Sequence, residues 1–311
     1  MTLVSRFAPS PTGRLHLGHA YSALRAHDLA KAAGGRFILR IEDIDPGRTR
    51  EEYVGGIVED LDWLGLHPEG PVWRQSERVA VYADALDGLR GRGLLYPCFC
   101  TRADIAAATS APHGREGAVY PGTCRGLDPA EAARRIAAGE SHAWRLDVGA
   151  ALSLVRRPSE DCDRSGSKDH PMPAPAGMTN DRLRWHDSTA GWITADPAAH
   201  GDVVLARKDA PASYHLAVTI DDAAQGVTDI VRGLDLFAAT DVHRLLQALL
   251  GLPTPRYHHH PLLTGPDGRR LAKRDNAPTI AALREGGADP MALVRALRRG
   301  QVPVGFGLAS A

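Results

Sequence analysis

The chain has 311 residues, of which 43% are hydrophobic, and its 37 basic residues balance 37 acidic ones. This length and apolar content allow one large globular domain or two smaller ones, and the balanced charge gives no overall sign of a nucleic-acid-binding protein. Because the first residues lack the apolar core of a signal peptide and no apolar run could span a bilayer, we expect a cytoplasmic protein without membrane contact.

The first predicted elements are a strand, a turn and a helix. Residues 3–8 form a short apolar run typical of a buried strand, and a helix is expected from about residue 19 to 33. The turn between them, APSPTGRLHLGH, carries an H-x-x-H pair, His16 and His19. Its glycines let a ligand approach the backbone, and a helix amino terminus attracts anions, so the turn predicts a phosphate site. The alternative is a tight turn with surface histidines.

The next segments repeat the alternation of strand and helix. The run RFILRIEDID, residues 36–45, predicts a second apolar strand that ends in acidic residues. Thr49 and Glu52 have the spacing of a capping box, followed by apolar residues at helical spacing as far as Leu64. Strands that alternate with helices indicate a parallel sheet.

From about Tyr96 the pattern changes, which predicts an inserted subdomain over residues 96–182. It contains a helix near 128–138, a strand in SHAWRLDV, and a segment rich in Pro, Ser, Asp and Gly at about 156–181. Such a composition without periodicity is typical of a mobile loop.

Three of the four cysteines, Cys98, Cys100 and Cys124, lie within 27 positions of one another. This clustering favours a metal site over disulfides, and three thiolates would leave tetrahedral zinc one ligand short. An empty site remains the alternative. The fourth, Cys162, falls in the predicted loop and is expected to be a free thiol.

The chain then returns to alternating strands and helices. Residues 202–207 and 214–222 have strand-like sequences that are expected to resume the sheet, and a helix follows through DVHRLLQALLGL. The triplet His258 to His260 precedes an apolar PLL and is expected to belong to a strand near the nucleotide site. Two short helices are expected in the last sixty residues. Lys273, one of only four lysines, follows a GPDG turn and suits the β- and γ-phosphates of a nucleotide, although such a segment alone is usually a solvated basic loop.

Several of these segments together resemble a known family. HLGH and RLAKR are similar to the two signature motifs of class I aminoacyl-tRNA synthetases, and RFAPSPTGRLHLGH, RIEDIDPGR, QSER and YHLAVTIDD resemble the glutamyl branch. Arg270 and Ala272 depart from the second signature. The resemblance implies an α/β fold: a Rossmann-like parallel sheet with an inserted α+β subdomain and a small C-terminal helical subdomain. The expected division is a catalytic domain at 1–95 and 183–250, an acceptor and zinc subdomain at 96–182, and a signature-loop and stem-contact region at 251–311.

The resemblance also implies the activity. It implies tRNA-independent activation of L-glutamate with ATP and Mg²⁺, and, because the chain stops at Ala311 before any anticodon-binding domain, transfer of glutamate to queuosine in the anticodon loop of tRNA(Asp). A monomer is expected. Two alternatives stay open: a truncated glutamyl-tRNA synthetase that charges a tRNA 3′ end, and a non-catalytic tRNA-binding paralogue.

The residues that the resemblance assigns fall into four groups. They are His16, His19 and Lys273 for catalysis; these three with Pro9 and Gly18 for ATP; Arg6, Ser10, Glu42, Tyr214 and Arg232 for glutamate; and Cys98, Cys100, Tyr120 and Cys124 for one structural Zn²⁺.

Overall fold

The computed structural model describes residues 2–101, 103–105, 119–156, 183–264 and 278–301, together with the backbone of 307–308. Most of the predicted mobile loop with Cys162, and the basic segment with Arg270, Ala272 and Lys273, lie outside these residues. Within the described ranges, no helix is both long and apolar enough to cross a membrane.

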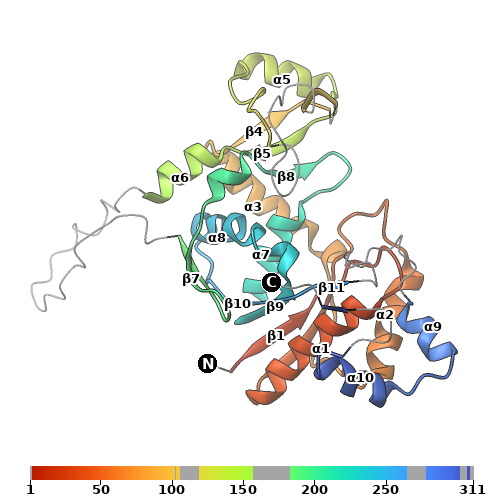
Figure 1. Cartoon of the computed structure of the whole chain (residues 1–311). Coiled ribbons are helices and arrows are strands. Elements are labelled where there is room, and N and C mark those ends of the chain that lie inside the picture. Colours follow the sequence, from red (N-terminus) through yellow and green to blue (C-terminus); the bar gives the residue numbers. More distant parts are fainter. Residues whose placement is uncertain are drawn as a thin grey trace, which may run out of the picture.

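A seven-stranded sheet forms the centre of the molecule, as the alternation of strands and helices predicts (Figure 1). All neighbouring strands pair in parallel except the last two, β6 and β7, which form an antiparallel hairpin. In sheet order the strands are β3 (Trp73–Arg74), β2 (Arg36–Ile41), β1 (Val4–Phe7), β9 (Asp229–Gly233), β10 (Arg256–His260), β6 (Arg184–Asp187) and β7 (Gly191–Thr194).

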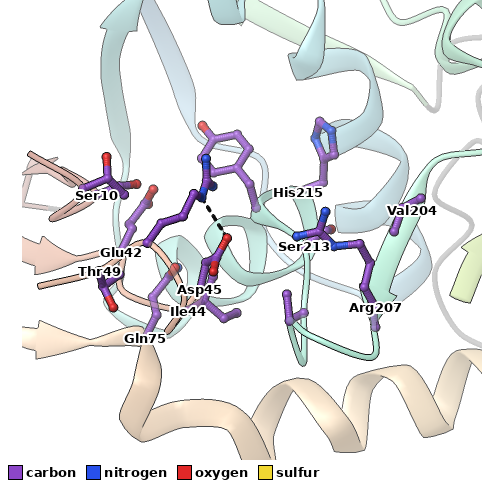
Figure 2. A pocket seen from close by; sticks show the side chains of 16 residues that line it. Ser10, Glu42, Ile44, Asp45, Thr49, Gln75, Val204, Arg207, Ser213 and His215 are labelled. Carbon is purple, nitrogen blue, oxygen red and sulfur yellow. Dashed lines mark hydrogen bonds and ion pairs between the residues drawn. The ribbon is translucent and has the colours of Figure 1, made fainter. Parts of the chain in front are cut away.

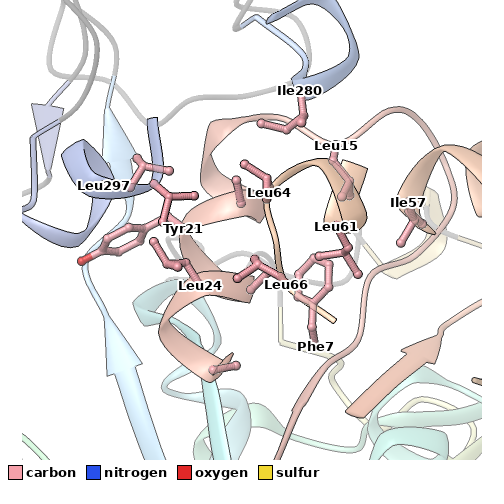
Figure 3. Close-up of a cluster of buried hydrophobic side chains, with 14 of the residues drawn as sticks. Phe7, Leu15, Tyr21, Leu24, Ile57, Leu61, Leu64, Leu66, Ile280 and Leu297 are labelled. Carbon is pink, nitrogen blue, oxygen red and sulfur yellow. The ribbon is translucent and has the colours of Figure 1, made fainter. Parts of the chain in front are cut away.

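Helices cover both faces of this sheet, and its strands β1 and β2 are accordingly buried on both sides along nearly their whole length. On one face are α1 (Leu17–Ala32), α2 (Glu51–Trp63), α9 (Ile280–Glu285) and α10 (Pro290–Arg298), which share the core cluster of Figure 3. A second core cluster contains side chains of α3 (Val79–Gly91), α6 (Val148–Arg156), α7 (Tyr214–Ala224) and α8 (Ala239–Leu250). Short 3₁₀ turns are η1 (Gln75–Arg78), η3 (Pro197–His200) and η4 (Leu234–Leu236).

A smaller antiparallel sheet projects from the main body, with α5 (Pro129–Ala137) beyond it (Figure 1). Its strands are β4 (Leu95–Cys98), β5 (Ala143–Leu146) and β8 (Val204–Arg207). We expected residues 202–207 to resume the main sheet, but β8 pairs with β5 instead. Two strands alone are marginally stable in water, and β8 supplies the third strand. A separate short pair joins β11 (Leu263–Thr264) to β12 (Gly307–Leu308).

The predicted strand at residues 214–222 is wrong, because this segment forms helix α7. Its run Val218, Thr219 and Ile220 is β-branched, which favours a strand. However, Ser213 caps the helix by accepting a hydrogen bond from the Leu216 N–H, and every residue from Leu216 to Asp222 is buried. A helix that is buried on all sides lacks the polar face on which helix prediction depends.

The predicted capping box at Thr49 and Glu52 does not form either. The helix begins one residue later than that motif requires, with Arg50 as its N-cap and no side-chain hydrogen bond there. The Thr49 N–H instead donates to the Asp45 carbonyl, so Thr49 still belongs to the preceding turn.

Candidate active site

The turn after β1 places two histidines at the amino terminus of α1. His16 is the N-cap: its Nδ1 accepts a hydrogen bond from the Gly18 N–H at 3.1 Å. His19 Nδ1 accepts reciprocally from the His16 N–H at 3.2 Å, and the ring centroids are 3.8 Å apart. A backbone N–H can only donate, so neither Nδ1 carries a proton and each neutral ring is protonated on Nε2. Both rings can therefore donate from Nε2 to an anion.

Gly18 is required by the position of the His16 ring. A Cβ at this residue would lie 2.9 Å from His16 Cε1 and 3.1 Å from His16 Nδ1. Any side chain would push the ring away from its capping position, which explains the glycine between the two histidines.

Two adjoining cavities open at the carboxyl ends of the central strands, where parallel α/β sheets bind ligands. The larger cavity holds about 480 Å³ and the smaller, drawn in Figure 2, about 320 Å³. Both are lined by Ser10, Thr12, Glu42 and Tyr214, so they form one continuous site. Every described residue predicted for ATP or glutamate lines the larger cavity: Arg6, Pro9, Ser10, His16, Gly18, His19, Glu42, Tyr214 and Arg232.

Arg6 belongs to a buried network of balanced charges. Its Nε lies 2.9 Å from Asp222 Oδ1, and its Nη1 donates to the Val231 carbonyl. Arg40 lies 2.8 Å from the same Asp222 oxygen and 3.3 Å from Glu42 Oε1. Two guanidinium groups thus neutralise two carboxylates, and Arg6 already has an anionic partner inside the protein. Arg40 and Asp222 were not predicted as partners, because they come from different elements, β2 and α7.

Glu42 follows β2 and presents its carboxylate at the boundary of the two cavities. Burial raises the pKa of Glu42, and the positive charges of Arg40 and Arg6 oppose that rise. A ligand ammonium placed beside it would further favour the ionised form.

Arg232 is buried, yet its hydrogen-bond partners are all uncharged. Its Nε donates to His259 Nε2 at 3.1 Å, and its Nη1 lies 3.2 Å from His243 Nδ1 and 3.3 Å from the Tyr214 hydroxyl. Its Nη2 donates to Thr240 Oγ1 at 2.6 Å. Among the described residues it has no ion-pair partner, so a positive charge faces the larger cavity without compensation.

Several residues that surround Arg232 were not predicted from the sequence. Thr240, His243 and Gln247 form a buried polar stripe at helical spacing on α8, and the first two contact Arg232. This stripe is the signal that could have revealed them. His259 was predicted to belong to a strand. It lies in β10 directly opposite Arg232 of the neighbouring strand β9, which makes the two residues neighbours.

The three predicted thiols meet in the small subdomain, away from the cavities. The sulfur atoms of Cys98, Cys100 and Cys124 lie within 4.8 Å of one another. The Tyr120 hydroxyl is 3.8 Å from Cys100 Sγ and accepts a hydrogen bond from the Cys124 N–H. Burial and the neighbouring Cys124 raise the pKa of Cys100 to about 11. Three thiols and a phenol within this distance are a donor set that suits tetrahedral zinc.

A mostly parallel sheet with an anion-binding helix start, a carboxylate and an uncompensated buried arginine around one cavity defines the catalytic domain of a class I aminoacyl-tRNA synthetase. The chain belongs to the family described as "tRNA synthetases class I (E and Q), catalytic domain", whose model matches residues 2–157 and 165–306. The resemblance inferred from the signature motifs is thereby confirmed.

Within this family, the chain is similar to proteins named Glutamyl-Q tRNA(Asp) synthetase. It is 46% identical over 300 residues to that of Rhodobacter capsulatus, covering 93% of this chain and 97% of the relative. It is 43% identical over 303 residues to that of Symbiobacterium thermophilum, covering 94% of this chain and 84% of the relative.

The fold also matches the solved structure of a glutamate tRNA ligase. The glutamate tRNA ligase of Elizabethkingia meningosepticum, in complex with its amino acid, superposes with a TM-score of 0.71 at 26% identity. The match covers 96% of this chain but 60% of the ligase, so this chain spans about three fifths of the ligase's length.

Proposed function

We propose that this protein activates L-glutamate with ATP, without needing tRNA, and transfers the glutamyl group to queuosine in the anticodon loop of tRNA(Asp). The observation that carries the proposal is the buried Arg232, which has no ion pair with a described residue and shares one cavity with Glu42, His16 and His19. The similarity to proteins named Glutamyl-Q tRNA(Asp) synthetase over more than nine tenths of the chain supports the choice of acceptor.

Glutamate fits the charges around the larger cavity. Its side-chain carboxylate would pair with Arg232 and accept a hydrogen bond from the Tyr214 hydroxyl, while Glu42 would hold its ammonium group. Ser10 offers a further hydroxyl at the boundary of the cavities. Arg6 also lines the larger cavity and would orient the α-carboxylate, although its charge is already shared with Asp222.

The activation step joins the two substrates at the start of α1. An α-carboxylate oxygen of glutamate attacks the α-phosphorus of ATP, a mixed anhydride forms and pyrophosphate leaves. The Nε2–H groups of His16 and His19, together with the helix amino terminus, would stabilise the charge that develops on the phosphoryl oxygens. Mg²⁺ would enter with ATP, and Pro9 and Gly18, which line the larger cavity, would contact the nucleotide. We also propose that Lys273 provides a cationic side chain for the β- and γ-phosphates of ATP.

The transfer step needs a hydroxyl group on the acceptor. A queuosine hydroxyl would attack the carbonyl carbon of the adenylate, an ester would form and AMP would leave. This acceptor would have to reach the same cavity that holds the adenylate.

We also infer one structural zinc ion, held by Cys98, Cys100, Cys124 and Tyr120. A cation would favour the thiolate form of Cys100, whose pKa burial and Cys124 raise, and would lower the pKa of the Tyr120 phenol, which burial and Cys98 raise. It would tie β4 to the segment before α5.

The experiment measures two activities of the purified protein. Exchange of pyrophosphate into ATP that requires glutamate, but no tRNA, tests activation. Incorporation of labelled glutamate is then compared among tRNA(Asp) with queuosine, tRNA(Asp) without it, and tRNA(Glu). Label only on tRNA(Asp) that contains queuosine supports the proposal. Label on the terminal ribose of tRNA(Glu) would favour a truncated glutamyl-tRNA synthetase, and no exchange at all would favour a non-catalytic tRNA-binding protein.

A further inference from the structure

Arg232 lies in the middle of a buried chain of imidazoles. On one side, His259 Nε2 accepts from Arg232 Nε, and His259 Nδ1 lies 2.8 Å from Asp187 Oδ2. On the other side, His243 Nδ1 lies 3.2 Å from Arg232 Nη1, and His243 Nε2 lies 3.1 Å from His215 Nδ1. Strand β10 and helices α8 and α7 therefore converge on a single guanidinium group through neutral side chains.

The protonation of His259 follows from its two partners. Burial would raise the pKa of Asp187, but hydrogen bonds from the Ala190 N–H, His259 and the Thr189 N–H outweigh it and lower the pKa. The ionised carboxylate can only accept, so His259 carries its proton on Nδ1. The guanidinium can only donate, so His259 Nε2 must present a lone pair. Both constraints are met by one neutral tautomer.

The same reasoning gives the tautomer of His243 and the direction of its hydrogen bond to His215. Because Arg232 Nη1 donates, His243 Nδ1 is a lone pair and the proton of the neutral ring is on Nε2. That proton is donated to His215 Nδ1. Burial, together with the charge of Arg232, lowers the pKa of His243 well below its ordinary value and that of His259 to about 4, so both rings stay neutral at physiological pH.

We propose that His243 and His259 are positioning residues, which hold Arg232 by neutral acceptors so that its charge is reserved for the side-chain carboxylate of glutamate. This inference rests on the proposed function. An arginine in a protein interior usually pairs with a carboxylate, as Arg6 does with Asp222. A carboxylate in place of either imidazole would also fix Arg232, but it would compete with the substrate for the same charge.

Four of the five N–H groups of Arg232 are engaged by His259, His243, Tyr214 and Thr240. These contacts define the plane of the guanidinium and leave one Nη2–H without a described acceptor. The Tyr214 hydroxyl, which accepts from Arg232, keeps its own proton for donation. Because Arg232 and Tyr214 both line the larger cavity, one carboxylate could accept from both of these donors, and the held guanidinium would reduce the ordering cost of binding.

The test uses substitutions at His243 that differ in charge but not in shape. In asparagine, Oδ1 replaces the lone pair of Nδ1, and in aspartate the same position is anionic. We expect His243→Asn to bind glutamate within about threefold of the wild type, and His243→Asp to raise the glutamate KM by about a hundredfold or more. His243→Leu and His259→Leu remove an acceptor and should raise the glutamate KM by about tenfold to a hundredfold, with the KM for ATP nearly unchanged.

Glutamate-dependent pyrophosphate exchange gives both KM values, and calorimetric titration with glutamate gives binding apart from catalysis. His258→Leu is the matched control for His259→Leu. It removes the neighbouring histidine of β10, whose side chain contacts Asp229 on the other side of the sheet. Thermal melting checks that each variant is folded. If the leucine variants fail to fold, the comparison of His243→Asn with His243→Asp decides.

Equal glutamate affinity in His243→Asn and His243→Asp, or parallel rises in both KM values, would overturn the assignment while leaving the proposed function standing. Absence of glutamate binding and exchange in the wild type would instead overturn both proposals.

Discussion

The two buried arginines at the larger cavity differ in their surroundings more than in their exposure. Arg6 is 4% exposed and Arg232 is 5% exposed, yet Arg6 has Asp222 at 2.9 Å and Arg232 is held by imidazoles, a phenol and a hydroxyl. A buried charge is costly without a counter-ion. Binding of a carboxylate therefore relieves a cost at Arg232 that Asp222 already relieves at Arg6.

At the residue scale, His19→Ala and Lys273→Ala should each slow adenylate formation far more than they raise the glutamate KM. Each substitution removes charge stabilisation that is used in the transition state, worth about 2 to 4 kcal/mol. Pyrophosphate exchange measures both quantities, and His67→Ala, at an exposed side chain, is the control. Wild-type exchange rates in either variant would refute the role given to that residue.

The buried histidines also make stability depend on pH. Burial lowers the pKa of His215 and of His259 from 6.5 to about 4; His200, Arg232 and His243 surround the former, and Arg232, Asp187 and His260 the latter. Between these values the unfolded chain binds more protons than the folded one, so stability falls as the pH falls from 6.5 to 4.

Each histidine contributes up to about 1.4 kcal/mol per pH unit in this window. We expect urea denaturation to give a lower free energy of unfolding at pH 5 than at pH 7, and a smaller difference in His259→Gln. An unchanged difference in that variant would count against His259 as a source of the effect.

At the element scale, two arginines fasten the last helices to the first ones. Arg284 of α9 lies 3.1 Å from Asp60 and 3.0 Å from Glu59 of α2, and Arg298 of α10 lies 2.8 Å from Asp28 of α1. The Asp60 side chain is 2% exposed, whereas that of Asp28 is 36% exposed. The first connection thus includes a buried carboxylate and the second is an open surface pair.

This difference predicts unequal costs of the same substitution. Arg284→Met should lower the free energy of unfolding by about 2 to 4 kcal/mol, because Asp60 would remain buried without its partner. Arg298→Met should cost about 1 kcal/mol or less, as exposed pairs do. Denaturant titration of the two variants provides the comparison, and equal costs would contradict the burial argument.

The small subdomain yields a prediction about metal content. Protein purified without added zinc should contain one zinc ion per chain, and Cys100→Ser or Cys124→Ser should lose it, since each removes a thiolate ligand. Elemental analysis measures the stoichiometry. Cys162→Ser is the control and should keep the metal; normally folded wild-type protein without zinc would refute the site.

At the scale of the whole molecule, local patterns predicted the sheet and the phosphate turn but not how distant elements combine. The apolar runs of β1 and β2 and the motif around His16 are each contained in a few consecutive residues. Helix α7 was misread because burial on all sides removes its periodicity, and β8 was assigned to the wrong sheet because only pairing with β5 decides that. The neutral surroundings of Arg232 depend on the packing of α8 and β10 together, which no local pattern contains.

The start of α9 is attached to the turn that precedes α1. Thr279 forms a β-bridge with His16, and the Ile280 N–H donates to the Leu15 carbonyl at 2.9 Å. Lys273 precedes Thr279 by six positions, and a chain of that length spans at most about 21 Å. Because Thr279 is fixed to the turn that carries His16, the length of this segment sets an upper limit on the distance between that turn and Lys273, the residue proposed to contact the phosphates. Loss of the backbone contacts at Thr279 and Ile280 would relax this limit.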